Sequence, residues 1–242
     1  MIFFDLDDTI LDTKNCNKRI YERIRADLKV DMDADLFRRK LRTSLRPRMI
    51  KYFEFQYNET IGIDPLDFLL METPYEEEHM ELFKEAVWSD LKDIFSGVSK
   101  DEFYETVLKR RNDYTEALPG MVELLTDLSK EHKLGIVTNG LSEIQHKKID
   151  TLGIRHLFKD IFVSGDFGYG KPDPKFYAHV IHKSSCDKKH SIMIGDNPQG
   201  DVMGALSAGM MAIYFNGREV DYDLNVAHNA DELRAEIERL LG

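Results

Sequence analysis

The sequence MIFFDLDDTILDT, Met1–Thr13, places a short apolar run directly before a cluster of carboxylates. Residues 2–4 are too few for anything but a buried strand, and Asp5 and Asp7 follow them at once. Ligands of open α/β sheets bind beyond the carboxyl ends of the strands, so we expect one small ligand to reach both acids. Carboxylates packed this closely repel one another unless a cation or a proton intervenes. The stretch therefore predicts a strand that ends in a chemical site.

The bulk composition indicates a folded protein of one large or two smaller domains. The chain has 242 residues, of which 42% are hydrophobic, and a formal net charge of −11. This charge argues against nucleic acid polymers and anionic membranes as partners. Cys16 and Cys186 form no disulfide framework, and no apolar run approaches the roughly 18 residues of a membrane span. We expect a reduced, cytoplasmic protein that is a monomer or a weak homo-oligomer.

Residues 14–116 show the spacing of helices and contain no convincing strand. Apolar residues recur there at intervals of three and four, and the segment 61–74, with its glycine and prolines, interrupts the pattern. Asp35 and Ser99 are the expected N-caps of two of these helices. The apolar positions that define the block are Ile20, Ile24, Leu28, Leu36, Leu41, Leu45, Met80, Leu82, Phe83, Val87, Leu91, Phe103, Val107 and Leu108.

From about residue 117 the pattern alternates between strands and helices. Ser142, with Gln145 three residues later, matches a capping box at the start of one helix. Such alternation predicts a parallel sheet with helices on both faces, a Rossmann-like α/β fold. The expected strands cover residues 134–137, 161–163, 191–194 and 211–215, and the expected helices cover residues 121–130, 142–152, 174–183, 205–209 and 229–241.

Two domains follow from these patterns. Residues 1–13 and 117–242 form the expected α/β core domain, because the first strand needs the later strands as neighbours in one sheet. Residues 14–116 form an all-α domain that is inserted after the first strand.

Polar side chains follow four of the expected strands. In a parallel sheet the carboxyl ends of the strands lie on one edge, so we expect these residues to converge although they are far apart in the chain. They are Asp5 and Asp7, Thr138, Lys171 in a loop stiffened by prolines, and Asp196 with Asp201.

Phosphoryl transfer through an aspartyl phosphate is the chemistry that uses this set. Asp5 is the expected nucleophile, and Asp7 is the expected acid and base for the leaving oxygen and the water. Thr138 and Lys171 would hold the transferring oxygens. Mg²⁺ prefers hard oxygen ligands, and at Asp5 and Asp196 it would offset the repulsion between these acids and a phosphate. Taken alone, Thr138 fits an ordinary helix cap and Lys171 a surface lysine, so the hypothesis depends on the whole set.

In four motifs the chain resembles the haloacid dehalogenase superfamily. These are DLDDT at 5–9, IVTNG at 136–140, GKPDP at 170–174 and IGDNPQGD at 194–201, and the inserted helical block resembles the family's α-helical cap. The resemblance implies that the Asp7 backbone carbonyl also binds Mg²⁺ and that Asp196 is the third metal ligand. It also implies that Asp201 orients the metal site or Lys171. Asn139, in the second motif, is included with Thr138 and Lys171 among the expected phosphate ligands.

Residues 138–149 and 158–177 are more narrowly similar to the pyrimidine 5'-nucleotidase branch of that family. The resemblance implies small phosphorylated metabolites as substrates, with nucleoside 5'-monophosphates first. The helical block carries a mixed basic and aromatic set that could stack on a base or reach a phosphate, although a plain helix with an apolar stripe explains part of it equally well. The set is Arg46, Arg48, Lys51, Tyr52, Phe53, Phe55 and Tyr57.

Three rival functions share parts of this pattern. A dehalogenase would use Asp5, but displacing halide needs no proton donor, so Asp7 argues against it. A sugar-phosphate phosphatase or a phosphomutase would keep all four motifs, because these differ in the substrate or in how water is excluded. A binding protein on a decayed version of the fold would have lost Asp5 or Asp196, and neither is lost.

Overall fold

The computed structural model describes residues 1–51, 77–111, 113–216 and 224–242, and of residues 46, 48–51 and 77–80 it describes the backbone alone. The described residues divide into two compact units. The first contains Met1–Thr13 and Thr115–Gly242, and the second contains the described residues of 14–114. The mixed basic and aromatic set predicted to contact the leaving group lies outside the described side chains, as does the predicted interruption at 61–74.

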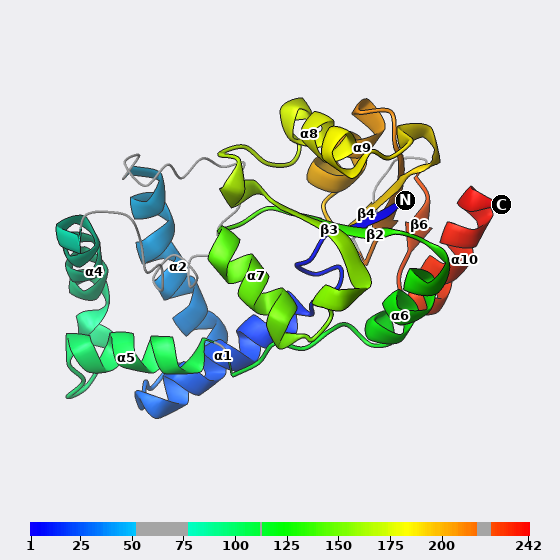
Figure 1. Cartoon of the computed structure of the whole chain (residues 1–242). Helices are drawn as coiled ribbons and strands as arrows, with labels where there is room; N and C mark the ends of the chain where they lie inside the picture. Colours follow the sequence, from blue (N-terminus) through cyan, green and yellow to red (C-terminus); the bar gives the residue numbers. More distant parts are fainter. Residues whose placement is uncertain (52–76, 112, 217–223) are drawn as a thin grey trace. The chain divides into compact units, whose positions relative to one another are not determined.

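The first unit is built on a parallel sheet, as predicted. Within the described residues the sheet has six strands in the order β3-β2-β1-β4-β5-β6, with the N-terminal strand in the interior (Figure 1). All the pairings are parallel. The strands are β1 (Ile2–Phe4), β2 (Leu134–Thr138), β3 (Phe158–Val163), β4 (Ile192–Gly195), β5 (Met211–Phe215) and β6 (Val226–Ala227).

Helices cover both faces of this sheet, because β1, β2 and β4 are apolar on both sides and fully buried. In Figure 1, α8 and α9 lie on one face, and α6 and α10 lie on the other. Phe3, Val137 and Met193 point to the α8 and α9 face and pack there against Phe176 and Val180 of α8. The helices of this unit are α6 (Met121–Glu131), α7 (Ser142–Thr151), α8 (Pro174–Ser184), α9 (Gly204–Ser207) and α10 (Ala230–Leu241).

Short helical turns connect several of these elements. Pro198–Met203 is a π-helical turn, η6, which links β4 to α9. The 3-10 turns of the unit are η3 (Arg155–Leu157), η4 (Ser164–Asp166) and η5 (Lys188–His190).

The second unit is helical throughout its described residues. Ser99 caps one helix as predicted, since its side chain accepts a hydrogen bond from Glu102 N at 3.1 Å. The Asp35 cap was wrong: the Leu36 N–H donates to Asp33 Oδ1 at 2.9 Å, so Asp33 is the capping residue. The elements are α1 (Thr13–Asp27), α2 (Ala34–Lys51), α4 (Glu77–Leu91), η2 (Lys92–Ile94) and α5 (Lys100–Arg110).

Most of the predicted apolar positions of the second unit form its core. Ile20, Leu41 and Phe103 are fully buried, and Trp88 stacks on Phe95 with 5.4 Å between the ring centroids. Leu82 and Leu108 lie in helices as predicted but outside this core, because each is 55% exposed. Each lies one position beside a buried residue, Phe83 or Val107, and therefore on the flank of its helix.

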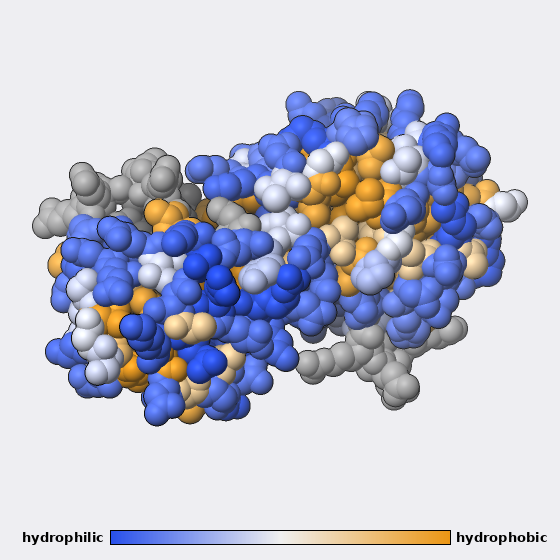
Figure 2. Space-filling model, turned by 90° about the horizontal axis from the view of Figure 1, so that it is seen from below, coloured by the Kyte–Doolittle hydropathy of each residue, from blue (hydrophilic) through white to orange (hydrophobic). Residues whose placement is uncertain are grey.

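The surface carries mainly hydrophilic side chains on the face shown in Figure 2, where hydrophobic side chains gather in a few patches. The large hydrophobic side chains that the structure leaves exposed include Leu82, Leu108, Met203 and Leu206. Among the described residues, no helix combines the length and the apolar character that a membrane crossing needs.

Candidate active site

The site begins where β1 ends at the carboxyl edge of the sheet. Phe4 lies level with Ile136 of β2 and Ile194 of β4, and the Asp5 N–H donates to Ile194 O at 2.8 Å. The chain therefore leaves the sheet at Asp5 with Thr138 on one side and Gly195 on the other. Parallel register alone brings these distant segments to one edge.

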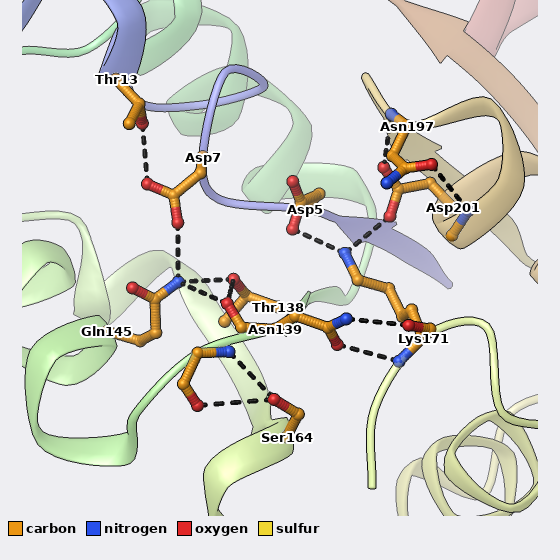
Figure 3. Close-up of polar contacts among 12 residues, drawn as sticks. Asp5, Asp7, Thr13, Thr138, Asn139, Gln145, Ser164, Lys171, Asn197 and Asp201 are labelled. Atoms are coloured by element: carbon orange, nitrogen blue, oxygen red, sulfur yellow. Dashed lines mark hydrogen bonds and ion pairs between the residues drawn. The ribbon is translucent and has the colours of Figure 1, made fainter. Parts of the chain in front are cut away.

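Lys171 joins two buried carboxylates at this edge. Its Nζ lies 2.6 Å from Asp5 Oδ1 and 2.6 Å from Asp201 Oδ1, and all three residues are buried (Figure 3). Burial lowers the pKa of Lys171, but the two carboxylates outweigh it and raise that pKa, so the ammonium stays charged. Burial raises the pKa of Asp5 to about 8, although Lys171 acts in the opposite direction.

Asp201 is fixed by the turn that follows β4. The Asn197 N–H donates to Asp201 Oδ2 at 2.9 Å, and Asn197 Oδ1 accepts from the Gly200 N–H at 2.8 Å. Asp201 packs directly against the backbone of Gly195. A Cβ on residue 195 would overlap the Asp201 carboxylate and lie 2.5 Å from Asp201 Cβ. The glycine at the strand end is therefore required for the acid to reach Lys171.

The acidic cluster at the strand ends suits a divalent cation. Among the described residues, Asp5, Asp196 and Asp201 each offer a carboxylate oxygen, and these oxygens lie within 4.8 Å of one another. Hard oxygen donors at this separation are the ligands that Mg²⁺ accepts, and such a cation would offset the repulsion between the acids. The Asp7 carboxylate is not part of this cluster.

Asp7 is held by a different group of residues. Its carboxylate accepts hydrogen bonds from Thr13 Oγ1 at 2.7 Å and Gln145 Nε2 at 2.9 Å, and Lys148 Nζ lies 2.9 and 3.2 Å from its two oxygens. Burial raises the pKa of Asp7, but the charge of Lys148 and these hydrogen bonds outweigh it, so the pKa lies below its ordinary range. Asp5 and Asp7 thus have opposite pKa shifts although one residue separates them.

Thr138 and Asn139 lie between these two groups. Thr138 Oγ1 accepts a hydrogen bond from Gln145 Nε2 at 2.7 Å. Both ends of the Asn139 amide bind the backbone of Lys171: Nδ2 donates to Lys171 O, and Oδ1 accepts from the Lys171 N–H, each at 2.8 Å. The Asn139 side chain therefore holds the lysine loop against β2, which is a second task beside the predicted contact with phosphate.

A comparison with protein families decides the assignment. The model of the haloacid dehalogenase-like hydrolases matches residues 2–215, which is most of the chain. The chain belongs to the haloacid dehalogenase-like hydrolases. The family that the four motifs predicted is thus confirmed.

Individual relatives of this hydrolase are phosphatases by name. The glyceraldehyde 3-phosphate phosphatase of Methanothermobacter thermautotrophicus is 24% identical over 89% of this chain and 84% of its own length. The pyrimidine 5'-nucleotidase YjjG of Escherichia coli is 25% identical over 58% of this chain and 61% of its own length. Among solved structures, the hydrolase YfnB from Bacillus subtilis, described as bound to magnesium, has a TM-score of 0.68 at 21% identity and covers 98% of this chain and 97% of its own.

The structure brings all the predicted site residues of this hydrolase to one edge of the sheet. Asp5, Lys171 and Asp201 are joined directly, and Asp196 lies within reach of the same cluster. The Asp7 carboxylate and Thr138 are linked through Gln145.

Sequence reasoning missed three residues that contact Asp7, which are Thr13, Gln145 and Lys148. The capping box was wrong: α7 begins after Leu141 without a side-chain cap, and Gln145 binds Asp7 and Thr138 instead. The signal that could have found Gln145 and Lys148 is their position, because both lie within the helix that leaves the Thr138 strand end and share one helical face.

Proposed function

We propose that the protein is a Mg²⁺-dependent phosphomonoester hydrolase that acts through an aspartyl phosphate on Asp5. The observation that carries the proposal is the contrast between two neighbouring carboxylates. Asp5 lies against Lys171 within the acidic cluster, whereas Asp7 lies against Lys148 and Gln145. Carboxylates in such different surroundings are suited to different steps of one reaction, because Asp5 lies among the groups that would hold the cation and the phosphoryl oxygens and Asp7 lies outside them. Mg²⁺ bound at Asp5 would keep that carboxylate ionised for the attack.

Each residue then has a separate task. An Asp5 oxygen attacks phosphorus, the bond from phosphorus to the leaving oxygen breaks, and Asp7 donates a proton to that oxygen. The approach of the phosphate anion raises the pKa of Asp7 and so favours the protonated form that this step needs. Asp7 later takes a proton from the water that attacks phosphorus, which releases phosphate and restores Asp5. Thr138 and Lys171 hold the phosphoryl oxygens through both steps.

The cation fits the same arrangement. Mg²⁺ bound at Asp5 and Asp196 would shield the negative charges of the nucleophile and the phosphate from each other, while Asp201, whose Oδ1 lies 2.6 Å from Lys171 Nζ, would orient that lysine. The fit rests on the three carboxylate oxygens that converge within 4.8 Å. The predicted contribution of the Asp7 backbone carbonyl belongs to the same proposal.

Nucleoside 5'-monophosphates are the first proposed substrates, and sugar phosphates are the second. The narrow motif similarity and the relative YjjG support the first class. The Methanothermobacter thermautotrophicus relative supports the second class, and it matches a larger share of the chain. We further propose a cytoplasmic location and a monomeric or weakly associating protein, the latter to be tested by size-exclusion chromatography.

The test is phosphate release by the purified protein. We expect hydrolysis of 4-nitrophenyl phosphate with Mg²⁺, none with EDTA, and a loss of about a thousandfold or more in Asp5→Asn, because the nucleophile is gone. If Asp5→Asn were as active as the wild type, Asp5 would not be the nucleophile and the proposed mechanism would be wrong. A panel of nucleoside monophosphates and sugar phosphates then compares kcat/KM between the two classes. A higher kcat/KM for sugar phosphates would rule out nucleoside monophosphates as the preferred substrates.

A further inference from the structure

Gln145 is a buried amide that joins the two halves of the site. It belongs to α7 and is 1% exposed. Its Nε2 lies 2.9 Å from Asp7 Oδ2, 2.7 Å from Thr138 Oγ1 and 3.2 Å from Asn139 O (Figure 3). One nitrogen thus contacts the proposed acid, the proposed phosphate ligand and the backbone beside it.

The direction of these hydrogen bonds orients the Thr138 hydroxyl. Gln145 Nε2 can only donate, so Thr138 Oγ1 accepts and its own hydrogen must point elsewhere. Among the described residues, the acceptor for that hydrogen is Asn139 O at 3.4 Å, which is long for a hydroxyl donor. The hydroxyl hydrogen is therefore available to a phosphoryl oxygen that arrives at the sheet edge. Gln145 also fixes the direction of the Asp7 carboxylate. Its Nε2 donates a hydrogen bond to Asp7 Oδ2, so this oxygen must present a lone pair to the amide.

The backbone around Gln145 is shaped to admit it. Gly140 has a φ of +147°, and a Cβ on that residue would lie 2.9 Å from Gln145 Cδ and Cγ. Ser164 Oγ in turn accepts from the Gly140 N–H at 2.9 Å and fixes this close approach. If Gln145 only packed against the start of α7, its amide would not need to lie between Asp7 and Thr138. Its position therefore indicates a role in the site.

We propose that Gln145 is a positioning residue that aligns the Asp7 acid with the Thr138 phosphate ligand. The inference rests on the proposed phosphatase function and deepens it. Lys148 supplies charge to Asp7, whereas Gln145 supplies a neutral link that sets the direction in which both oxygen groups face.

The test compares two substrates that differ in their need for an acid. A nitrophenolate leaves without a proton, whereas the alkoxide of glycerol 1-phosphate needs one. In Gln145→Met, which keeps the side-chain size, we expect kcat/KM, which reports the steps up to phosphoryl transfer to Asp5, to fall about 100-fold on glycerol 1-phosphate and about 10-fold on 4-nitrophenyl phosphate, by the usual range for acid catalysis. Lys147→Met, on an exposed position of the same helix, should match the wild type. Gln145→Glu keeps the shape and should give the same order of losses.

A double variant separates the action through Thr138 from the action through Asp7. On 4-nitrophenyl phosphate, Gln145→Met should cause no further loss once Thr138→Val has removed the hydroxyl, because the two act as one unit. On glycerol 1-phosphate a further loss should remain. Equal losses of kcat/KM on both substrates, additive losses in the double variant, or an unchanged kcat/KM would overturn the inference. The activity of the wild type in the same assay tests the proposed function separately. If the wild type releases no phosphate, the proposed function is wrong, and the inference about Gln145, which rests on it, is wrong as well.

Discussion

Asp5 and Asp7 lie one residue apart in the sequence, and their surroundings determine how each one titrates. Asp5 is enclosed, and burial dominates its pKa although Lys171 lies 2.6 Å away. The side chain of Asp7 is 29% exposed and has Lys148 and two neutral donors as neighbours. Burial of the Asp5 carboxylate disfavours its charged form and so costs stability at a site of chemistry.

The raised pKa of Asp5 predicts a stability change in the variant Asp5→Asn. Between the ordinary value of 3.8 and about 8, the unfolded chain has lost a proton that the folded chain keeps. The free energy of unfolding contributed by this group therefore falls as pH rises through that window. Without metal, we expect Asp5→Asn to be more stable than the wild type by about 1–3 kcal/mol at pH 8 and by less at pH 4. Thermal unfolding in EDTA across this range measures it, and a difference that does not vary with pH would contradict the account.

The lowered pKa of Asp7 predicts the opposite pH dependence for Lys148→Met. A carboxyl group with a depressed pKa stabilises the fold above its unfolded value, and that contribution is lost as pH falls through the folded value. We therefore expect Lys148→Met to lose about 1–3 kcal/mol of unfolding free energy at pH 7 and less at pH 3. Chemical denaturation at both values measures this, with Lys147→Met as the matched control. A loss as large at pH 3 as at pH 7 would point to packing and not to charge.

At the scale of elements, the turn after β4 determines the geometry of the cluster. The strand end, η6 and α8 meet around Asp201: the single hydroxyl hydrogen of Tyr177 in α8 is shared between Gly200 O at 2.8 Å and Asp201 O at 3.1 Å. Gly204 approaches the same tyrosine ring too closely to carry a side chain. Three elements therefore fix one carboxylate, which in turn fixes Lys171.

The close approach at Gly195 predicts the effect of a single methyl group. In Gly195→Ala the new Cβ would overlap the Asp201 carboxylate, so Asp201 must move away from Lys171. We expect a loss of about 1–3 kcal/mol in stability, typical of overpacking, together with weaker Mg²⁺ binding. Gly200→Ala is the milder change on the same turn, because its Cβ would meet the Asn197 side chain at 3.2 Å, a tight contact that a shift of that side chain by a few tenths of an ångström would relieve. Equal stability and equal Mg²⁺ affinity of Gly195→Ala and the wild type would refute the packing argument.

At the scale of the whole molecule, much of the fold could be predicted from the chain alone. Ile2–Phe4 is too short and too apolar for anything but an interior strand, and the later alternation of strands and helices fixes the parallel sheet. The convergence of Asp5, Lys171 and Asp201 followed from this topology. β6 was not predicted, since Val226–Ala227 has only two residues and therefore no readable periodicity.

The site was less predictable where one local pattern allows two uses. Ser142 and Gln145 fit a capping box, and only the tertiary structure shows that Gln145 reaches Asp7. Asp33 and Asp35 are equally good caps by residue type, and the position of the first helical residue decides between them. Thr13 gave no signal, because a threonine near a helix start is common for reasons unrelated to chemistry.

Binding of Mg²⁺ should stabilise the protein as a whole, because a ligand that binds only the folded state adds to the unfolding free energy. At a concentration 100 times Kd the expected gain is about 2.7 kcal/mol. The melting temperature of the wild type should rise with Mg²⁺, and that of Asp196→Asn should rise much less, since one of the three carboxylates is lost. An equal rise in Asp196→Asn would show that the cation binds elsewhere.

The most direct measurement is the detection of a phosphoryl group on Asp5. In Asp7→Asn, the nucleophile and an activated leaving group remain, but the base for the hydrolytic water is gone, so the intermediate should accumulate. The variant is mixed with 4-nitrophenyl phosphate and Mg²⁺, quenched in acid, digested and mapped by mass spectrometry. The account predicts one phosphoryl group on the peptide that contains Asp5, and none when Asp5→Asn is added. A phosphoryl group on another residue, or nitrophenol release without any phosphorylated peptide, would contradict it.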